Sequence, residues 1–313
     1  MTEKEIIKNG IISRQFNKNI DQLKFIIFDI EYGGFGAMVS RRKLAMQFGL
    51  YFNRNVIFNY TDYMYDDPYK CISRYSLNDM KEKIYTFNFN MDQEDKVVYF
   101  DFNYYWNKIE LRKKYHELSV GNINFKEFSG ILLNLLELND EYKIKLEEKK
   151  RELNFNSLNK IIGIHIRRGD KEVESPFIPI SRFIDELRII SKKTGIKNVL
   201  LCSDSSNVYK EVKKDLSDFN IIYDSTEIRY DNKNSNLCIV AETRTLAKEE
   251  TFSCVKNIEL LSECDYIIGQ SNVQFAKIAG CKLIDKKNNL DVLTLIDPFT
   301  LKNINWDLLG TGK

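Results

Sequence analysis

Residues 161–180 read IIGIHIRRGDKEVESPFIPI, so an apolar run stands directly against a histidine, two arginines and several carboxylates. The β-branched run at 161–166 favours a buried strand of a parallel sheet, and the charged residues begin where that strand should end. In open α/β sheets, ligands bind at the carboxyl ends of the strands. This stretch therefore predicts an α/β fold and also the place of a ligand site.

The adjacent residues Arg167 and Arg168 narrow the class of ligand. A guanidinium is permanently charged, planar and forked, so it matches phosphate or carboxylate oxygens with paired hydrogen bonds. The two side chains should leave an extended chain on opposite faces, so that one of them can point inward. Pro176 and Pro179 follow shortly and stiffen the segment. We expect a phosphorylated ligand; the alternative is a solvated turn in which the arginines pair with the nearby carboxylates.

The first part of the chain contains a βαβ pattern between Leu23 and Tyr60. It consists of the strand-like KFIIFDI, a glycine-rich turn, the helical SRRKLAMQFGLYF and the strand-like NVIFNY. Gly34 and Gly36 in that turn would allow exposed N–H groups at a helix start, which suits an anion, although a plain glycine turn is the alternative. Further along, 97–106 reads as a strand and 125–153 reads as helical.

Beyond residue 155 the alternation becomes regular and is typical of a doubly wound α/β domain. It predicts strands at 161–166, 198–203, 219–223, 265–269 and 282–284, and helices at 181–192, 207–216, 247–263 and 272–279. We therefore predict the GT-B architecture of many sugar-nucleotide transferases, in which two Rossmann-like domains face a cleft. We expect the first Rossmann-like domain at 1–155, the second at 156–300, and a segment at 301–313 that crosses back to the first domain.

Polar residues recur where successive predicted strands end. They are His165 to Asp170, then Ser203 and Asp204, then Asp224, and finally Gln270 to Asn272. Each of them could be an ordinary turn or capping residue. Because the carboxyl ends of parallel strands share one edge, four such positions together predict a pocket.

The composition excludes several classes of protein. The chain has 313 residues, with 43% hydrophobic residues, 29% charged residues and a net charge of +2, which gives no general attraction for nucleic acid or membranes. The start MTEKEIIKNG lacks a basic segment followed by an apolar core, and no run of about 18 apolar residues occurs. We therefore expect no signal peptide and no integral membrane segment, and predict a cytoplasmic protein that can lie against the inner membrane.

The histidines and cysteines do not form a metal-binding pattern. His116 and His165 are the only two histidines, and the six cysteines include no C-x-x-C pair. We therefore predict no structural or catalytic zinc, and expect the cysteines to be reduced and structural.

The segment GIHIRRGDK at 163–171, with Glu174 and then FIPI at 177–180, resembles the central motif of the α-1,6-fucosyltransferases. That family reads roughly GVHVRRTDK and then ExxFxPI, and one residue is missing here between Lys171 and Glu174. A bare HxRRxD is shared with α-1,2-fucosyltransferases and protein O-fucosyltransferases, so the FxPI extension carries the resemblance. Segments 200–214 and 257–279 are similar to two further family motifs, and the early glycine-rich turn is also similar.

The resemblance implies roles for particular residues. For GDP-fucose binding it indicates His165, Arg167, Arg168, Asp204, Asp224, Asn257, Ser271, Asn272, Gly34 and Gly36. Arg167, with Arg168 and the amides near Ser271, would neutralise the departing diphosphate. Glu174 would be the base that takes the acceptor proton, with Glu172 as the alternative, while Asp170 and Lys171 shape the same loop.

One position departs from the family pattern. Asn257 stands where the family has an aspartate that reads guanine, and an amide offers no charge-assisted pair to the guanine N–H groups. The preference for guanine is therefore less firmly implied than the use of a nucleotide sugar.

The resemblance as a whole implies a bacterial, inverting, metal-independent fucosyltransferase without a cofactor. It would move L-fucose from GDP-β-L-fucose to an oligosaccharide or glycolipid, forming an α-1,6 bond to a GlcNAc-type acceptor. An α-1,2-fucosyltransferase is the alternative, although the tryptophan-containing third motif of that group is absent at 270–273. A non-catalytic protein that binds nucleotides or glycans with the same fold is the alternative of another class.

Overall fold

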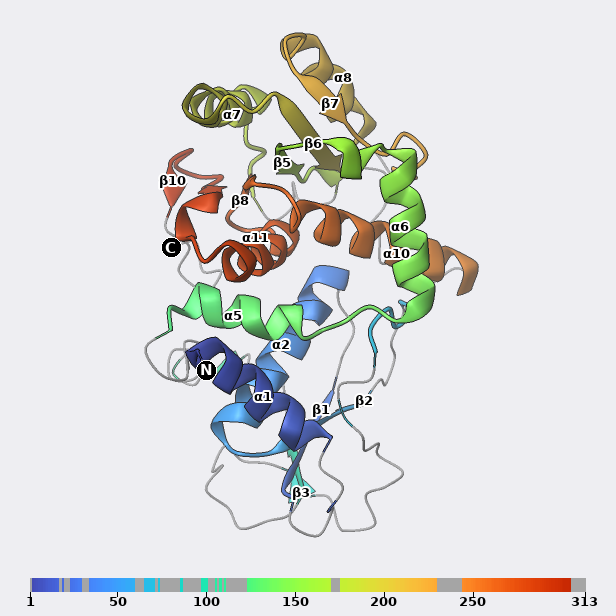
Figure 1. The fold of residues 1–313 in the computed structure, drawn as a ribbon, viewed down its shortest axis with the longest axis vertical. Coiled ribbons are helices and arrows are strands. Elements are labelled where there is room, and N and C mark those ends of the chain that lie inside the picture. The colour runs from blue at the N-terminus through green and yellow to red at the C-terminus, as the bar shows by residue number, and fades with distance from the viewer. Residues whose placement is uncertain are drawn as a thin grey trace. The chain divides into compact units, whose positions relative to one another are not determined.

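The computed structural model describes residues 2–16, 19, 23–29, 34–59, 65–70, 73, 85–86, 97–100, 105, 107–108, 110, 123–169, 175–229 and 244–304. The chain forms two compact units (Figure 1). Unit 1 comprises Met1–Tyr63 and Tyr69–Glu137, and unit 2 comprises Met64–Pro68 and Leu138–Lys313. Within the described ranges, no helix combines the length and the apolar character needed to cross a membrane.

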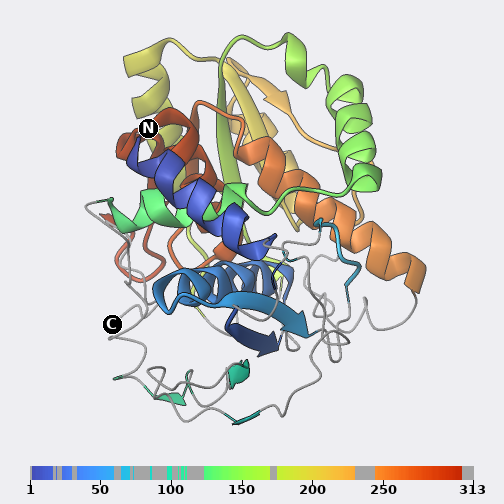
Figure 2. The same cartoon turned by 60° about the horizontal axis from the view of Figure 1, so that its bottom comes forward.

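Unit 1 is built on a parallel sheet with the strand order β2-β1-β4-β3. Its strands are β1 (Phe25–Asp29), β2 (Asn55–Asn59), β3 (Tyr85–Thr86) and β4 (Val97–Phe100), and its helices include α1 (Glu3–Gln15), α2 (Phe35–Tyr51) and α5 (Phe125–Asn134). Figure 2 shows α2 lying along β1 and β2, which it connects. Phe48 of α2 packs with Phe28 and Phe100 of the sheet in a buried core. The predicted βαβ unit is confirmed.

Unit 2 is built on a larger sheet with the strand order β10-β9-β8-β5-β6-β7. Its strands are β5 (Ile161–Ile166), β6 (Asn198–Ser203), β7 (Asn220–Ile222), β8 (Tyr266–Gln270), β9 (Leu293–Ile296) and β10 (Asn303–Ile304). All pairings are parallel except that of β10 with β9. The chain proceeds from β5 to β6 and β7, and then returns to place β8 on the other side of β5. The switch point of the topology, where ligands bind in such sheets, therefore lies between β5 and β8.

Helices cover both faces of this sheet. The helices are α6 (Asp140–Glu152), α7 (Ile180–Thr194), α8 (Ser206–Asp215), α10 (Arg244–Leu261) and α11 (Gln274–Lys287). On one face, Phe183 and Leu187 of α7 pack with Ile162, Ile164 and other apolar side chains in the main core. On the other face, α10 approaches so closely that a Cβ on Gly163 would lie 2.7 Å from Leu261, which explains a glycine inside the strand.

The described elements match most of the regular alternation expected from the sequence. Strands 161–166 and 198–203 are confirmed with their boundaries, and the predicted α/β class is confirmed in both units. Among the described cysteines, Cys202, Cys254 and Cys264 are buried thiols outside any disulfide.

Two predictions of secondary structure are wrong. The stretch 125–153 is not one helix, because α5 ends at Asn134 and α6 starts after Asn139, whose side chain accepts a hydrogen bond from the N–H of Tyr142. Residues 282–284 are not a strand but the buried part of α11, and the strand after this helix is β9, which the sequence pattern did not indicate. The apolar run LTLI of β9 is short, and a helix and a buried strand share such runs.

Candidate active site

Arg167 is the first residue after β5, and it lies at the switch point of the unit 2 sheet. Its backbone N–H donates to the side-chain oxygen Oε1 of Gln270, at the end of β8, over 2.6 Å. Its Nη1 forms an ion pair with Oδ2 of Asp204, just beyond β6. The side chain is 20% exposed. A permanent positive charge is thus held at the strand end where a ligand is expected, and it is braced from both neighbouring strands.

Arg168 is held by several contacts within the protein. Its backbone N–H donates to Oδ1 of Asp204 (2.7 Å), and its Nη2 donates to the carbonyl of Ile178 (2.7 Å). The guanidinium also lies 4.8 Å from the ring centre of Phe177, a cation–π contact. Burial lowers the pKa of this guanidinium. Arg168 therefore ties the RRG turn to the FIPI segment, which explains why these two parts of the motif occur together.

Gly169 is required by the shape of the turn. Its φ of +44° lies in the left-handed region, and a Cβ at this position would collide with the Asp204 carboxylate. Only a residue without a side chain fits both conditions at low cost. The glycine of RRG is therefore required by the backbone turn and by the position of the Asp204 carboxylate.

His165 is the fifth residue of β5 and is only 6% exposed. Its ring stacks on Phe275 of α11 at a centroid distance of 5.5 Å. Burial, together with the nearby charge of Arg167, lowers the pKa of His165 to about 3, so the imidazole is neutral at physiological pH. Nδ1 is buried without a hydrogen-bond partner in the part of the chain that the structure describes. A neutral ring with an unused nitrogen can accept or donate a hydrogen bond to a ligand.

Ser271 and Asn272 follow β8 directly. The backbone N–H of Ser271 donates to the carbonyl of Ile296 (3.0 Å), so this amide belongs to the sheet. Asn272 donates through Nδ2 to the hydroxyl oxygen of Ser175 (2.7 Å). The Ser271 amide therefore has an intramolecular partner, and Asn272 anchors the chain just before the FIPI segment.

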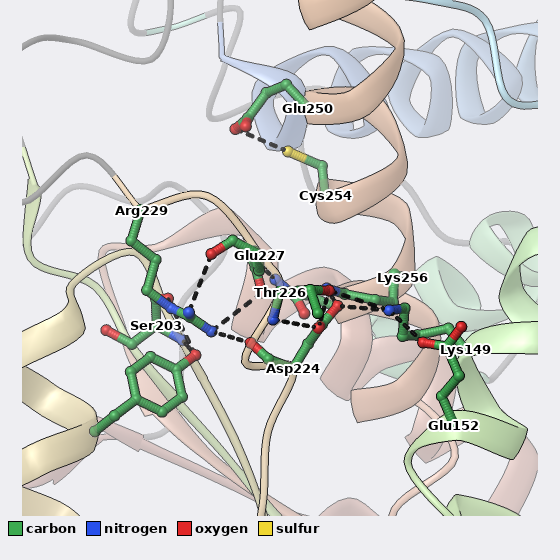
Figure 3. A network of polar contacts seen from close by, with 12 residues as sticks. Lys149, Glu152, Ser203, Asp224, Thr226, Glu227, Arg229, Glu250, Cys254 and Lys256 are labelled. Carbon is green, nitrogen blue, oxygen red and sulfur yellow. Dashed lines mark hydrogen bonds and ion pairs between the residues drawn. The ribbon is translucent and has the colours of Figure 1, made fainter.

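Asp224, beyond β7, takes part in a network of buried charges (Figure 3). Its Oδ2 accepts from Nζ of Lys256 over 2.6 Å and lies 3.5 Å from Nζ of Lys149. Its Oδ1 accepts from both the N–H and the hydroxyl of Thr226. Burial raises the pKa of Asp224, but the hydrogen bonds from Lys256 and Thr226 outweigh it, so the pKa lies below its usual value. Both carboxylate oxygens are thus already bonded within the protein.

Asn257 joins the same network through Glu227, a residue that the sequence pattern did not single out. Nδ2 of Asn257 donates to Oε1 of Glu227 (2.9 Å), and Oε2 of Glu227 accepts from Lys256 (3.2 Å). Figure 3 shows Glu227 between Lys256 and Arg229. Glu227 lies three residues after a predicted strand-end carboxylate, and that proximity is the only signal that could have indicated it.

The structure brings together many but not all of the predicted residues. The described ends of β5, β6, β7 and β8 share one edge of the unit 2 sheet, so His165, Arg167, Arg168, Asp204, Asp224, Ser271 and Asn272 gather there. Gly34 and Gly36 belong to unit 1, where Gly34 precedes α2 with an ordinary φ of −62°. Asp170, Lys171, Glu172 and Glu174 lie outside the described residues. Within the described ranges, no group of three or more His, Cys, Asp or Glu side chains could hold a metal ion.

Solved structures of known fucosyltransferases share this fold. NodZ α-1,6-fucosyltransferase soaked with GDP-fucose has a TM-score of 0.53 and 14% identity, covering 90% of this chain and 99% of that chain. NodZ from Bradyrhizobium has a TM-score of 0.52 and 15% identity, and the match covers 90% of this chain and 99% of that chain. A FUT1 mutant from Arabidopsis thaliana in complex with GDP has a TM-score of 0.50 and 12% identity, and the match covers 90% of this chain and 73% of that chain. These likenesses show that the chain has a GT-B-like fold, as predicted.

The family follows from the sequence. Residues 122–280, a little more than half of the chain, match the family model described as alpha-(1,6)-fucosyltransferase N- and catalytic domains. The chain belongs to this family, and it is an enzyme. The resemblance expected from the GIHIRRGDK and FIPI segments is thus confirmed. A search of the curated proteins finds no match.

Proposed function

We propose that this enzyme transfers L-fucose from GDP-β-L-fucose to a glycan hydroxyl with inversion, without a metal ion, and forms an α-1,6 bond to a GlcNAc-type acceptor. Residues 156–300 would bind the donor and residues 1–155 would face the acceptor. The observation that carries the proposal is Arg167, a guanidinium fixed at the switch point of the sheet. Membership of the alpha-(1,6)-fucosyltransferase family supports this choice of donor and linkage.

The guanidinium would act on the charge that develops during transfer. As the bond between the sugar and the phosphate breaks, negative charge builds on the diphosphate while the sugar becomes oxocarbenium-like. A positive group that is already oriented toward the leaving oxygens stabilises that state without reorganisation. The contacts that brace the backbone and the side chain of Arg167 support this role.

Recognition of the base would involve Asn257 and its neighbour. Because Glu227 accepts from Nδ2 of Asn257, the amide is oriented with Oδ1 as its remaining acceptor. An oxygen acceptor suits the N1–H and N2–H donors of guanine. Glu227 accepts a hydrogen bond from Asn257, so a carboxylate lies next to the position where the family has its aspartate.

The donor class can be tested by a thermal-shift screen of GDP, UDP, CDP and ADP. A ligand that binds the folded state stabilises it by mass action, by about 2.7 kcal/mol at a hundredfold excess over Kd. We expect a rise in Tm with GDP alone. GDP-fucose should then be consumed in the presence of chitooligosaccharide or lipid-linked acceptors, and linkage analysis of the product separates α-1,6 from α-1,2 transfer. Equal stabilisation by UDP and GDP would contradict the proposal.

Glu174→Gln should lower turnover by about a hundredfold or more while leaving GDP affinity nearly unchanged. The change keeps the shape of the side chain but removes the base that takes the acceptor proton, a role worth roughly 10²–10⁴ in rate. Initial rates with GDP-fucose and acceptor measure it, and Glu172→Gln is the matched control. If Glu172→Gln proves inactive and Glu174→Gln active, the base is Glu172.

A further inference from the structure

We propose that Gln270 and Asp204 are positioning residues that aim the Arg167 guanidinium, and that neither contacts the nucleotide sugar. This inference rests on the proposed function, because it concerns the residue assigned there to the diphosphate. The family resemblance places Asp204 among the donor-binding residues and gives no role to Gln270. The contacts of both side chains point instead to the turn after β5.

The two residues hold successive backbone amides of that turn. Oε1 of Gln270 accepts from the N–H of Arg167 at 2.6 Å, and Oδ1 of Asp204 accepts from the N–H of Arg168 at 2.7 Å. Oδ2 of Asp204 also accepts from Nη1 of Arg167. Gln270 is the last residue of β8, and Asp204 follows β6, so the turn is held from both strands that flank β5. The backbone and the side chain of Arg167 are fixed together.

The burial of Gln270 is unfavourable for the stability of the fold, which indicates that the residue has another role. It is completely buried, at 0% exposed, and its Nε2 has no hydrogen-bond partner among the described residues. A buried amide nitrogen without a partner destabilises the folded state, so an apolar side chain would give a more stable strand. What an apolar side chain could not provide is the acceptor for the N–H of Arg167. The residue therefore serves the turn rather than the stability of the core.

Asp204 also holds the turn after β5 and the side chain of Arg167. Each of its oxygens accepts one hydrogen bond from the arginine pair, and Gly169 packs against it with no room for a Cβ. A carboxylate facing a diphosphate would repel it, whereas a carboxylate bonded to the arginine fixes the direction of the guanidinium. Displacement of a positioned group by about 1 Å can cost roughly a hundredfold in rate. We therefore expect both residues to act on turnover through Arg167.

A double-mutant cycle tests this inference. Gln270→Leu and Asp204→Asn are prepared alone and together with Arg167→Ala, and GDP affinity and turnover are measured for each variant. The change at Asp204 keeps the size of the side chain beside Gly169 but turns an amide donor toward Nη1 of Arg167. Alone, each change should lower turnover at least about tenfold and weaken GDP binding. Combined with Arg167→Ala, each should add less than about a twofold further loss, because its target is gone.

Residues that contact the donor directly would give the opposite result. Their losses would multiply with that of Arg167→Ala, and this outcome would overturn the inference, as would full turnover of both single variants. If Arg167→Ala itself binds GDP and turns over normally, the clamp in the proposed function fails instead. Gln270→Met, whose flexible side chain fills irregular space, replaces Gln270→Leu if circular dichroism shows that the leucine variant is unfolded.

Discussion

Replacing Arg167 with alanine should lower turnover of GDP-fucose by about a hundredfold to a thousandfold. This is the usual cost of removing one oriented group that stabilises charge in a transition state. The side chain is only partly exposed and is held by the ion pair with Asp204, so its charge is fixed at the end of β5. Steady-state kinetics and a GDP titration measure the effect. Affinity for GDP should fall as well, since the ground-state diphosphate already carries negative charge.

The matched control is Arg188→Ala. Arg188 is an exposed arginine of α7 that pairs with Asp218 over 3.2 Å, and its loss should leave turnover unchanged. If the Arg167 clamp replaces a metal ion, the unaltered enzyme should also keep its activity in excess EDTA. Normal activity of Arg167→Ala would refute the clamp, whereas loss of activity in EDTA that added Mg²⁺ or Mn²⁺ restores would refute metal independence.

Replacing Lys256 with methionine should reduce the free energy of unfolding by about 3–5 kcal/mol, the largest stability effect that we expect. Lys256 is 1% exposed and bonds to both Asp224 and Glu227. Methionine matches the length of the side chain but leaves two buried carboxylates with less compensation, and breaking a buried ion pair from one side has this cost. Urea denaturation followed by circular dichroism measures the loss.

Lys287→Met provides the comparison for this measurement. Lys287 also bonds to a carboxylate, Asp265, over 2.9 Å, but its side chain is 44% exposed. Pairs of that kind contribute about 0–1 kcal/mol. A loss for Lys256→Met no greater than that for Lys287→Met would show that the buried network does not stabilise unit 2.

The sequence allowed prediction of the parts of the fold that depend on local pattern. β5 and β6 are continuous apolar runs with polar residues at their ends, so both their boundaries and the edge that carries Arg167 could be read directly. The clustering of His165, Arg167 and Asp204 follows from the same reasoning, because neighbouring parallel strands end together. The family motif indicated these positions independently.

Features that depend on tertiary context could not be predicted in this way. α11 continues through an apolar stretch that resembles a strand, because its surroundings bury it on most sides. The roles of Gln270 and Glu227 depend on which residue across the sheet or network each one meets, and a single sequence does not contain that information. The same holds for Asp224, whose place at a strand end was predicted but whose bonding to Lys256 was not.

The contact between Gly169 and Asp204 bears on how this family can diversify. The family motif carries threonine where this chain has glycine, and a β-branched side chain does not tolerate a φ of +44°. A homologue with a side chain at this position must therefore use a different backbone turn. Introducing the family threonine into this chain alone would therefore force the turn after β5 away from Asp204.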